Sequence, residues 1–477
     1  SEKLRILEDE NDWMKVATKD GFIGYVKTNA LNSVEKELVS RDYEEPEYTN
    51  ISENYTINMA WHNVSNADAN SYILETIAST KGLNTIAPTW FSLADTEGNI
   101  TSLADADYVN YAHQSNLEVW AVLRDFHGGI NSYEETYQVL SYTSKRAKLI
   151  NQVISKALET DVDGINLDFE LVSDECGPHY VQFVRELSVK CRQNGLVFSV
   201  DNYVPQPYNA HYDIEEQAAV ADYVVVMGYD EHTEGSYEAG SVASIGYLKN
   251  GISEALKSVP ADKLIAGVPF YTRLWFERPK TDEEFAADEG TEAENYPNKV
   301  KSSAYGMDDA AELISSMGAQ TEWDDKTKQN YAQWEGDGGV YKIWLEDTQS
   351  LEEKLKVIKE NQLAGVAEWS LGMEGSGVWD LILQQTQRLL TDQLRSDLTH
   401  RLIGNGILIV ILRTVWQILK QQLRHLVRIL VSQSRDRNDL RKWTDIFIGI
   451  DGLGNDLPVF HGIDLVDRQN HRGFHLG

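Results

Sequence analysis

Eight short runs of apolar and β-branched residues lie between residues 55 and 371, and amphipathic stretches separate them. Runs of this length are typical of strands, whereas the stretches between them have apolar residues at helical spacing. This alternation predicts an α/β fold with a covered parallel sheet, and eight repeats predict a (β/α)8 TIM barrel. The runs are Tyr55–Trp61, Thr85–Phe91, Glu118–Leu123, Asp163–Glu170, Leu196–Val204, Tyr223–Asp230, Leu264–Tyr271 and Gly365–Leu371, and the helical stretches include Thr143–Leu158, His179–Gln193, Gly246–Lys257 and Leu351–Asn361.

An open, doubly wound sheet is the alternative to a barrel. Such a sheet binds its ligand through a glycine-rich loop such as GxGxxG, and we find no such loop in the sequence. We therefore expect a barrel over residues 55–387. The long interval between the seventh and eighth runs, residues 275–348, is expected to form a small insertion on the rim of the barrel.

Three segments flank the predicted barrel. Residues 1–34 alternate between apolar and polar side chains around two hairpin turns, which predicts a partial all-β module. Residues 35–54 are polar and rich in Glu, which predicts a linker. Residues 388–477 contain no Glu, and they contain 11 Arg against 2 Lys. This change in composition indicates a tail of different origin, either out-of-frame or fused sequence or a helical appendage.

The charge of the chain is strongly negative. The formal net charge is −32, and residues 1–387 alone carry −36. Such an acidic body repels nucleic acid and anionic membrane surfaces, so we expect neither as a partner. The run ILIVIL is too short for a membrane span, because Arg413 interrupts it. The chain starts at Ser1 without a signal-peptide pattern, and we expect that an N-terminal region is missing.

The run DGINLDFE, residues 163–170, carries the first candidate site. Its period of two places Asn166, Asp168 and Glu170 on one face of a strand. Three adjacent polar side chains are tolerated on a solvent-exposed face or in a cavity whose ligand satisfies them. Asp163 lies off this face by parity, and we expect it to have a structural role at the start of the strand.

Aromatic and polar side chains gather at the other predicted strand ends, where a β/α barrel places its chemistry. Carboxylates surrounded by Trp and Tyr suit a sugar, because aromatic faces stack on pyranose rings and carboxylates act on the glycosidic bond. The candidates are Trp90, Asn202, Tyr203, Met227, Tyr229, Asp230, Tyr271, Arg273, Trp275, Glu368 and Trp369.

These motifs resemble those of glycoside hydrolase family 18, the chitinase-like hydrolases. DGINLDFE is similar to the DxxDxDxE signature of the family, residues 227–230 are similar to its MxYD motif, and Trp369 is similar to the Trp beneath its sugar site. The resemblance covers about residues 55–385. Asn166 stands where chitinases carry Asp, and this form resembles the spore-cortex and cell-wall N-acetylglucosaminidases. Residues 12–31 resemble the last half of a bacterial Src-homology-3-like wall-binding module.

The resemblance implies a retaining, substrate-assisted mechanism. Glu170 would be the general acid and then the base, while the 2-acetamido oxygen of the substrate attacks the anomeric carbon. Asp168 would orient the acetamide N–H, and Tyr229 would donate its hydroxyl to the acetamide oxygen. Asn166 would hydrogen-bond Asp168 without taking its proton. As substrate contacts the resemblance implies Trp369 and Asp230, and we also expect the motif residues Asn166 and Met227 and the strand-end aromatic residues Trp90, Tyr203, Tyr271 and Trp275 to contribute.

The histidines and cysteines indicate no further chemistry. His62, His127, His179 and His232 show no metal-binding spacing, and we expect neither a metal nor another cofactor. His127 and His232 follow strand ends, but loop polarity explains them equally well. Cys176 and Cys191 are either packing residues or one disulfide.

We therefore expect a secreted or wall-associated, monomeric glycoside hydrolase that cleaves β-linked N-acetylglucosamine polymers, with peptidoglycan as its substrate. A chitin-binding chitinase is the alternative within the same class. A catalytically silent carbohydrate-binding barrel is the alternative from another class, although a lectin has no need of an acid such as Glu170. A metabolic barrel inside the cell is disfavoured because no phosphate loop is found.

Overall fold

A computed structural model describes residues 3–18, 22–34 and 50–386. The chain forms two compact units, Ser1–Thr49 and Asn50–Gly477, which are described separately. The prediction for the tail, residues 388–477, lies outside the described residues, as does that for most of the linker.

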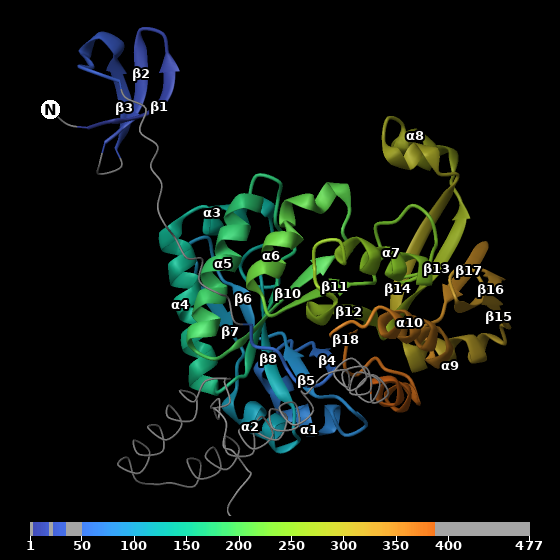
Figure 1. The fold of residues 1–477 in the computed structure, drawn as a ribbon. Helices are drawn as coiled ribbons and strands as arrows, with labels where there is room; N and C mark the ends of the chain where they lie inside the picture. The colour runs from blue at the N-terminus through green and yellow to red at the C-terminus, as the bar shows by residue number, and fades with distance from the viewer. Residues whose placement is uncertain (1–2, 19–21, 35–49, 387–477) are drawn as a thin grey trace, which may run out of the picture. The chain divides into compact units, whose positions relative to one another are not determined.

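Eight parallel strands form a closed barrel in the larger unit (Figure 1). Their order is β5-β4-β18-β12-β11-β10-β9-β8, and β8 pairs with β5 to close the ring. This confirms the predicted (β/α)8 barrel, and each predicted run contains most of one strand. The strands are β4 (Ile57–His62), β5 (Thr85–Pro88), β8 (Glu118–Arg124), β9 (Gly164–Asp168), β10 (Val197–Tyr203), β11 (Tyr223–Met227), β12 (Leu264–Pro269) and β18 (Gly365–Trp369).

Helices cover the outside of the barrel, as Figure 1 shows for α3 to α6. The longest of the described helices begins at Thr143 and presents its apolar residues at helical spacing to the core, for example Leu149, Val153 and Ala157. The helices are α1 (Ile73–Thr76), α2 (Ala106–Gln114), α3 (Tyr133–Leu140), α4 (Thr143–Thr160), α5 (Gly177–Gln193), α6 (Ile214–Val220), α7 (Ile245–Ala255) and α10 (Thr348–Glu360), with 3-10 turns η2 (Ala67–Tyr72), η3 (Pro207–Tyr212) and η4 (Ala261–Lys263). A further helix begins at residue 378.

The alternation along each strand separates two cores. One core lies between strands and helices and includes Ile165 and Leu167 of β9. The other fills the barrel interior and includes Trp61, Trp120 and neighbouring side chains of the other strands. A polar residue on the interior face of a strand is therefore surrounded by buried side chains instead of solvent.

A five-stranded antiparallel sheet forms the predicted insertion, with the order β14-β13-β17-β16-β15. It begins at Tyr271, because the chain leaves the barrel after Pro269 and starts a new strand. Tyr271 and Trp275 therefore belong to the insertion and not to the end of the seventh barrel strand. Its elements are β13 (Tyr271–Pro279), α8 (Asp282–Asp288), η5 (Glu292–Asn295), β14 (Asn298–Gly306), α9 (Met307–Met317), β15 (Thr321–Asp324), β16 (Gln329–Gly336) and β17 (Gly339–Trp344). The small strands β6 (Phe91–Leu93) and β7 (Ile100–Ser102) extend the barrel sheet beside β8.

A buried polar network joins the insertion to the barrel. Lys354 of α10 forms an ion pair with Glu346 at 2.7 Å, and both side chains are almost fully buried. Glu346 also accepts hydrogen bonds from Ser350 and from Gln329 of β16. Ser241, in the loop after β11, donates to Gln329. The network thus links three segments that are distant in sequence.

The smaller unit contains a three-stranded antiparallel sheet, β1 (Arg5–Glu10), β2 (Trp13–Ala17) and β3 (Ile23–Lys27), followed by the 3-10 turn η1 (Thr28–Ala30). Asn11 has φ of 60° in the turn between β1 and β2, which is the hairpin that the sequence predicts. The assignment of this sheet to a wall-binding module stays a prediction.

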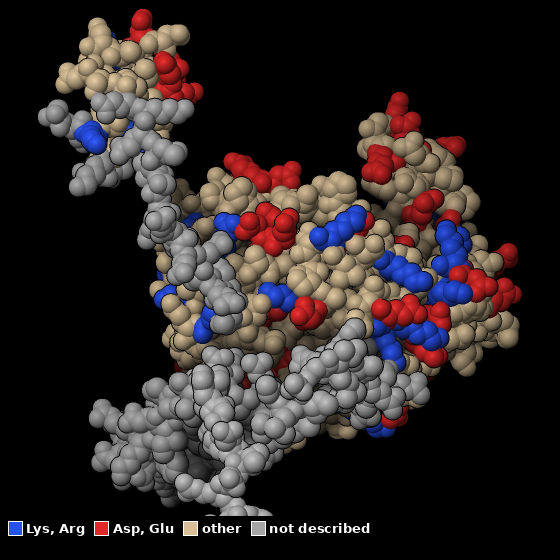
Figure 2. Space-filling view, viewed as in Figure 1, with Lys and Arg blue, Asp and Glu red and all other residues tan. Residues whose placement is uncertain are grey.

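Charged side chains of both signs are interspersed on the face of the molecule that Figure 2 shows, so Lys and Arg do not form a continuous surface over the described part of that face. Among the described residues, no helix has the length and apolar character needed to cross a membrane.

We predict that Lys354→Met destabilises the barrel by about 3–5 kcal/mol, because it leaves the Glu346 carboxylate buried without its cation. Denaturant unfolding measures the effect. Lys356→Met is the matched control on the same helix: its exposed pairs with Glu352 and Glu353 should contribute about 1 kcal/mol or less. Equal effects of the two substitutions would contradict the prediction.

Candidate active site

The end of β9 places the DGINLDFE motif at the centre of the barrel. Asn166 and Asp168 are on the interior face of the strand, while Ile165, Leu167 and Phe169 pack in the outer core. Glu170 follows two residues after the strand ends at Asp168. The predicted parity is therefore confirmed for Asn166 and Asp168, whereas Glu170 lies beyond the strand that was predicted to contain it.

Asp125, which follows β8, fixes the backbone of Glu170. Its carboxylate accepts the N–H groups of Glu170 and Leu171 at 2.8 and 2.9 Å, and it also accepts the Thr136 hydroxyl at 3.1 Å. Burial raises the pKa of Asp125 to about 7, although these hydrogen bonds favour its charged form. The side chain holds the chain after β9 in one position.

The Glu170 carboxylate accepts a hydrogen bond from the Tyr203 hydroxyl at 2.6 Å. Burial raises the pKa of Glu170, and the negative charge of Asp230 acts in the same direction. The bond from Tyr203 and the positive charge of Arg124 oppose this rise. A carboxyl group with a raised pKa keeps its proton to a higher pH than a free glutamate does and can release it to a bound group.

Asp168 lies between a cation and another acid. Its strand neighbour on β8 is Arg124, with which it is paired in register. Burial raises the pKa of Asp168 well above its usual range, and the charges of Glu170 and Asp201 raise it further. Its Oδ1 atom is buried and has no hydrogen-bond partner among the described residues.

The sequence predicts a hydrogen bond between Asn166 and Asp168. In the structure Asn166 bonds other residues instead. Its Nδ2 atom donates to Ser199 at 2.9 Å and to Asp201 at 2.8 Å, and its Oδ1 atom accepts the indole N–H of Trp61 at 3.0 Å. Asn166 is fully buried. Because its amide is occupied by protein groups, its expected role as a substrate contact needs correction to a structural one.

Four aromatic rings form a connected group beside these carboxyls. The ring of Trp61 lies 5.9 Å from that of Trp369 and 6.4 Å from that of Tyr229, and Tyr229 lies 6.3 Å from Tyr271. Trp369 is partly exposed, whereas the other three rings are buried.

Residues at the end of β11 complete this side of the site. Met227 is buried at the last position of the strand. Asp230 adopts a φ of 60° and accepts a hydrogen bond from the Tyr271 hydroxyl. The structure therefore brings together Asp168, Glu170, Tyr229, Asp230, Tyr203, Tyr271, Met227 and Trp369 of the predicted set.

Two predicted aromatic contacts lie elsewhere. Trp90 is 1% exposed and donates its indole N–H to Asn70 at 2.9 Å. Trp275 is 0% exposed and donates to the carbonyl oxygen of Gly240 at 2.8 Å. Neither ring has a free face for a sugar, so we assign both to packing.

Sequence reasoning missed two members of the site. Asp201 lies on the interior face of β10, whereas the candidate Asn202 points outward and bonds Gln217 at 2.7 Å. The parity of Ser199, Asp201 and Tyr203 was the available signal. Trp61 is the last residue of the first apolar run, and its sequence position alone did not indicate a place in the site.

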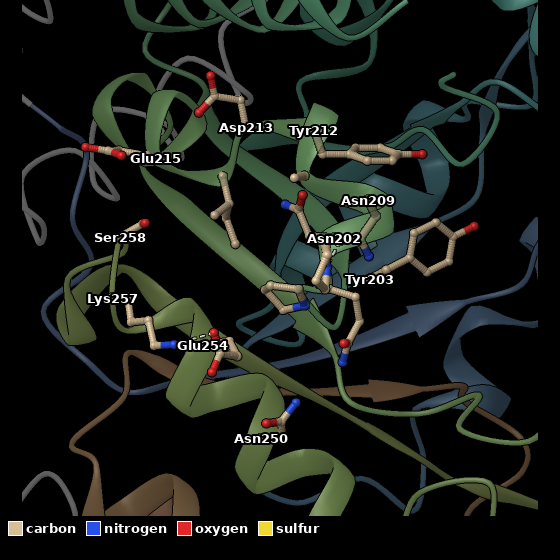
Figure 3. A pocket seen from close by; sticks show the side chains of 15 residues that line it. Asn202, Tyr203, Asn209, Tyr212, Asp213, Glu215, Asn250, Glu254, Lys257 and Ser258 are labelled. Carbon is tan, nitrogen blue, oxygen red and sulfur yellow. Dashed lines mark hydrogen bonds and ion pairs between the residues drawn. The ribbon is translucent and has the colours of Figure 1, made fainter. Parts of the chain in front are cut away.

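A pocket of about 570 Å³ lies next to the site, on the other side of β10. Figure 3 shows Tyr203 and Tyr212 on one side of it and Asn250, Glu254 and Lys257 on another. Tyr203 lines this pocket while its hydroxyl contacts Glu170. The Tyr203 side chain therefore forms part of the wall between this pocket and the candidate active site.

The remaining candidates have structural surroundings. His232 is bonded to the carbonyl oxygen of Ser241 at 2.8 Å. Asp163 contacts His113 and the N–H of Val119, as expected for a structural residue. Within the described ranges, no three His, Cys, Asp or Glu side chains form a metal-binding group.

The two cysteines are free and buried, which confirms packing and excludes the disulfide alternative. Burial raises the pKa of Cys176 to about 12.

Comparisons with known proteins agree with this geometry. Residues 55–374 match the family described as Glycosyl hydrolases family 18. The "Uncharacterized glycosylase YvbX" of Bacillus subtilis is 26% identical over 316 residues, which cover 64% of this chain and 85% of that protein. The "Cortical fragment-lytic enzyme" of Bacillus anthracis is 24% identical over 287 residues, which cover 58% of this chain and 62% of that protein.

The fold is also found among solved structures. The C-terminal domain of a putative chitinase from Desulfitobacterium hafniense superposes with a TM-score of 0.60. The match is 20% identical and covers 70% of this chain and 99% of that chain. At this identity the likeness shows the barrel fold alone.

We predict that Tyr203→Phe raises the pKa of Glu170 further, because it removes a hydrogen bond that favours the charged carboxylate. Titration of 13C-labelled glutamate by NMR measures this shift. Tyr208→Phe, at a 74% exposed position of η3, is the control and should leave the pKa of Glu170 unchanged. An unchanged or lower Glu170 pKa in Tyr203→Phe would contradict the assignment.

Proposed function

The chain belongs to glycosyl hydrolases family 18, and we propose that it hydrolyses β-linked N-acetylglucosamine-containing glycan with retention of configuration. The main observation that supports this proposal is the position of Glu170. Its carboxyl group has a raised pKa, accepts a hydrogen bond from Tyr203 and follows Asp168 at the end of β9.

Glu170 acts first as the acid and then as the base. It protonates the leaving glycosidic oxygen while the 2-acetamido oxygen of the substrate attacks the anomeric carbon and forms an oxazolinium ion. Water then attacks the same carbon, Glu170 takes the proton of that water, and the acetamido group is restored. General acid–base catalysis of this kind contributes about 10²–10⁴-fold to a rate. The Asp125 carboxylate, which accepts the backbone N–H of Glu170, holds Glu170 in place for both steps.

Asp168 supplies negative charge close to the developing positive charge. A buried carboxylate in a site of low dielectric constant stabilises a cation more strongly than one in water. The same carboxylate is suited to accept the acetamide N–H, which orients the attacking oxygen. Asp168 is flanked by Arg124 and Asp201, so its charge depends on these neighbours.

The aromatic group provides the remaining contacts. Trp369 is the partly exposed ring and forms the floor beneath the sugar. Tyr229 donates its hydroxyl to the acetamide oxygen. Asp230, oriented by Tyr271, accepts a hydrogen bond from a sugar hydroxyl.

We propose peptidoglycan of the cell wall or spore cortex as the substrate. A cortical fragment-lytic enzyme is among the relatives, and the sequence of residues 12–31 resembles part of a wall-binding module. A monomer outside the cell or in the spore fits this substrate. Chitin is the second candidate, because the barrel superposes on a putative chitinase.

We predict that Glu170→Gln lowers turnover of purified peptidoglycan by about 10²–10⁴-fold, because the amide can neither give nor take the catalytic proton. Release of reducing N-acetylglucosamine ends measures this, with a chitin oligomer tested in parallel. Glu234→Gln, at an exposed position after β11, is the control and should keep wild-type turnover.

Cleavage of the chitin oligomer alone would assign the chain as a chitinase. Binding of both glycans without cleavage by the wild type would contradict the catalytic proposal and would indicate a carbohydrate-binding barrel.

We predict that de-N-acetylated substrate is not turned over, because the attacking oxygen belongs to the acetamido group. The matched N-acetylated oligomer should be cleaved, and 1H NMR should show the β-anomer as the first product. An α-anomer, or equal cleavage of both oligomers, would exclude substrate assistance.

A further inference from the structure

Asp201 is a buried acid in the barrel interior to which the proposed mechanism assigns no step. Its side chain is 2% exposed and its Oδ1 atom accepts the Asn166 amide at 2.8 Å. Its Oδ2 atom is buried and has no hydrogen-bond partner among the described residues. A carboxylate oxygen buried in this way costs free energy unless it carries a proton or meets a donor.

Asp201 and Asp168 stand side by side. The register between β9 and β10 pairs Leu167 with Val200, so the next residues, Asp168 and Asp201, are neighbours on strands about 4.8 Å apart. Both side chains are on the interior face, and each has one buried oxygen without a partner. A single proton between the two carboxyls would give both oxygens a partner.

The surroundings do not neutralise both acids. The titratable or charged groups around this pair come from six elements: Arg124 at the end of β8 with Asp125 after it, Glu170 after β9, Tyr203 on β10, Tyr229 after β11, Tyr180 on α5 and Tyr271 on β13. Arg124 is the one cation in this set, and it interacts with the carboxyl groups of both Asp168 and Glu170. Adjacent carboxyls that share such a site titrate as a unit and retain a proton.

Asn166 cannot take that proton. Its amide oxygen is occupied by Trp61, and its amide nitrogen is directed at Asp201 and Ser199. Burial raises the pKa of Asp201 to about 8, while its hydrogen bond with Asn166 opposes the rise. Near neutral pH the proton therefore remains within the pair.

We propose that Asp201 is a positioning residue that shares one proton with Asp168 and thereby sets the charge and orientation of Asp168 toward the substrate. This inference rests on the proposed function for its catalytic consequence. The shared proton itself is a property of the resting protein. It stays within the pair through a turnover, so the hydrolysis needs no further reactant.

The first test is a titration without substrate. We expect the 13C signal of Asp168, assigned with Asp168→Asn in aspartate-labelled protein, to show two steps, the upper of which also appears in the signal of Asp201. In Asp201→Asn the signal of Asp168 should show one step, and the upper step should be absent. A wild-type Asp168 signal that does not respond to the upper step would overturn the proposal.

The second test exchanges the carboxyl group of Asp201 and the amide group of Asn166, which are joined by one hydrogen bond. Asp201→Asn should lower kcat about tenfold or more and leave KM within about threefold. The double variant Asn166→Asp/Asp201→Asn places an acid at the other end of the same 2.8 Å bond and should recover at least half of the loss on a logarithmic scale.

Ser199→Ala removes the other acceptor of the Asn166 amide without changing a titrating group, and it is the control for a merely structural effect. A double variant no more active than Asp201→Asn, or equal losses in Ser199→Ala and Asp201→Asn, would overturn the proposal. If the wild type cleaves neither peptidoglycan nor chitin, the proposed function fails, and the titration still decides whether the proton is shared.

Discussion

Burial of carboxyl groups inside a closed barrel is the constraint on which the site depends. Pairing of β8 with β5 closes the ring, so the interior positions of the strands face one another instead of water. Acids placed there must keep protons or find donors. Burial is accordingly the first cause of the raised pKa of Asp168, Asp201 and Glu170.

The same closure determines how the acids divide their roles. The Asp125 carboxylate accepts a backbone N–H just after the end of β9, and the Asp201 carboxylate accepts the amide N–H of Asn166. Glu170 lies beyond the last residue of its strand and contacts a partly exposed tyrosine. Depth in the barrel therefore separates Asp125 and Asp201, which are fully buried and hold the structure, from Glu170, which is partly exposed.

Local periodicity accounts for what could be predicted. The eight runs have the length and spacing of barrel strands, and parity alone placed Asn166 and Asp168 on one face, ahead of Glu170. The partners of these residues could not be predicted in the same way. The contact between Asp125 and Glu170 spans 45 residues and exists only because β8 and β9 are neighbours. Trp90 and Trp275 had the residue type of a sugar contact, but their orientation depends on distant acceptors such as Asn70 and Gly240.

The network around Lys354 also limits how this protein can diverge. The insertion contacts the barrel through Gln329, Glu346 and Lys354. All three side chains are buried, and Glu346 accepts hydrogen bonds from the other two. Deletion of the insertion in one genetic step would remove Glu346 and leave the Lys354 ammonium group of α10 buried without an anion. Descendants that dispense with the insertion must first pass through an apolar replacement at that helix position, so the two features are expected to be inherited together.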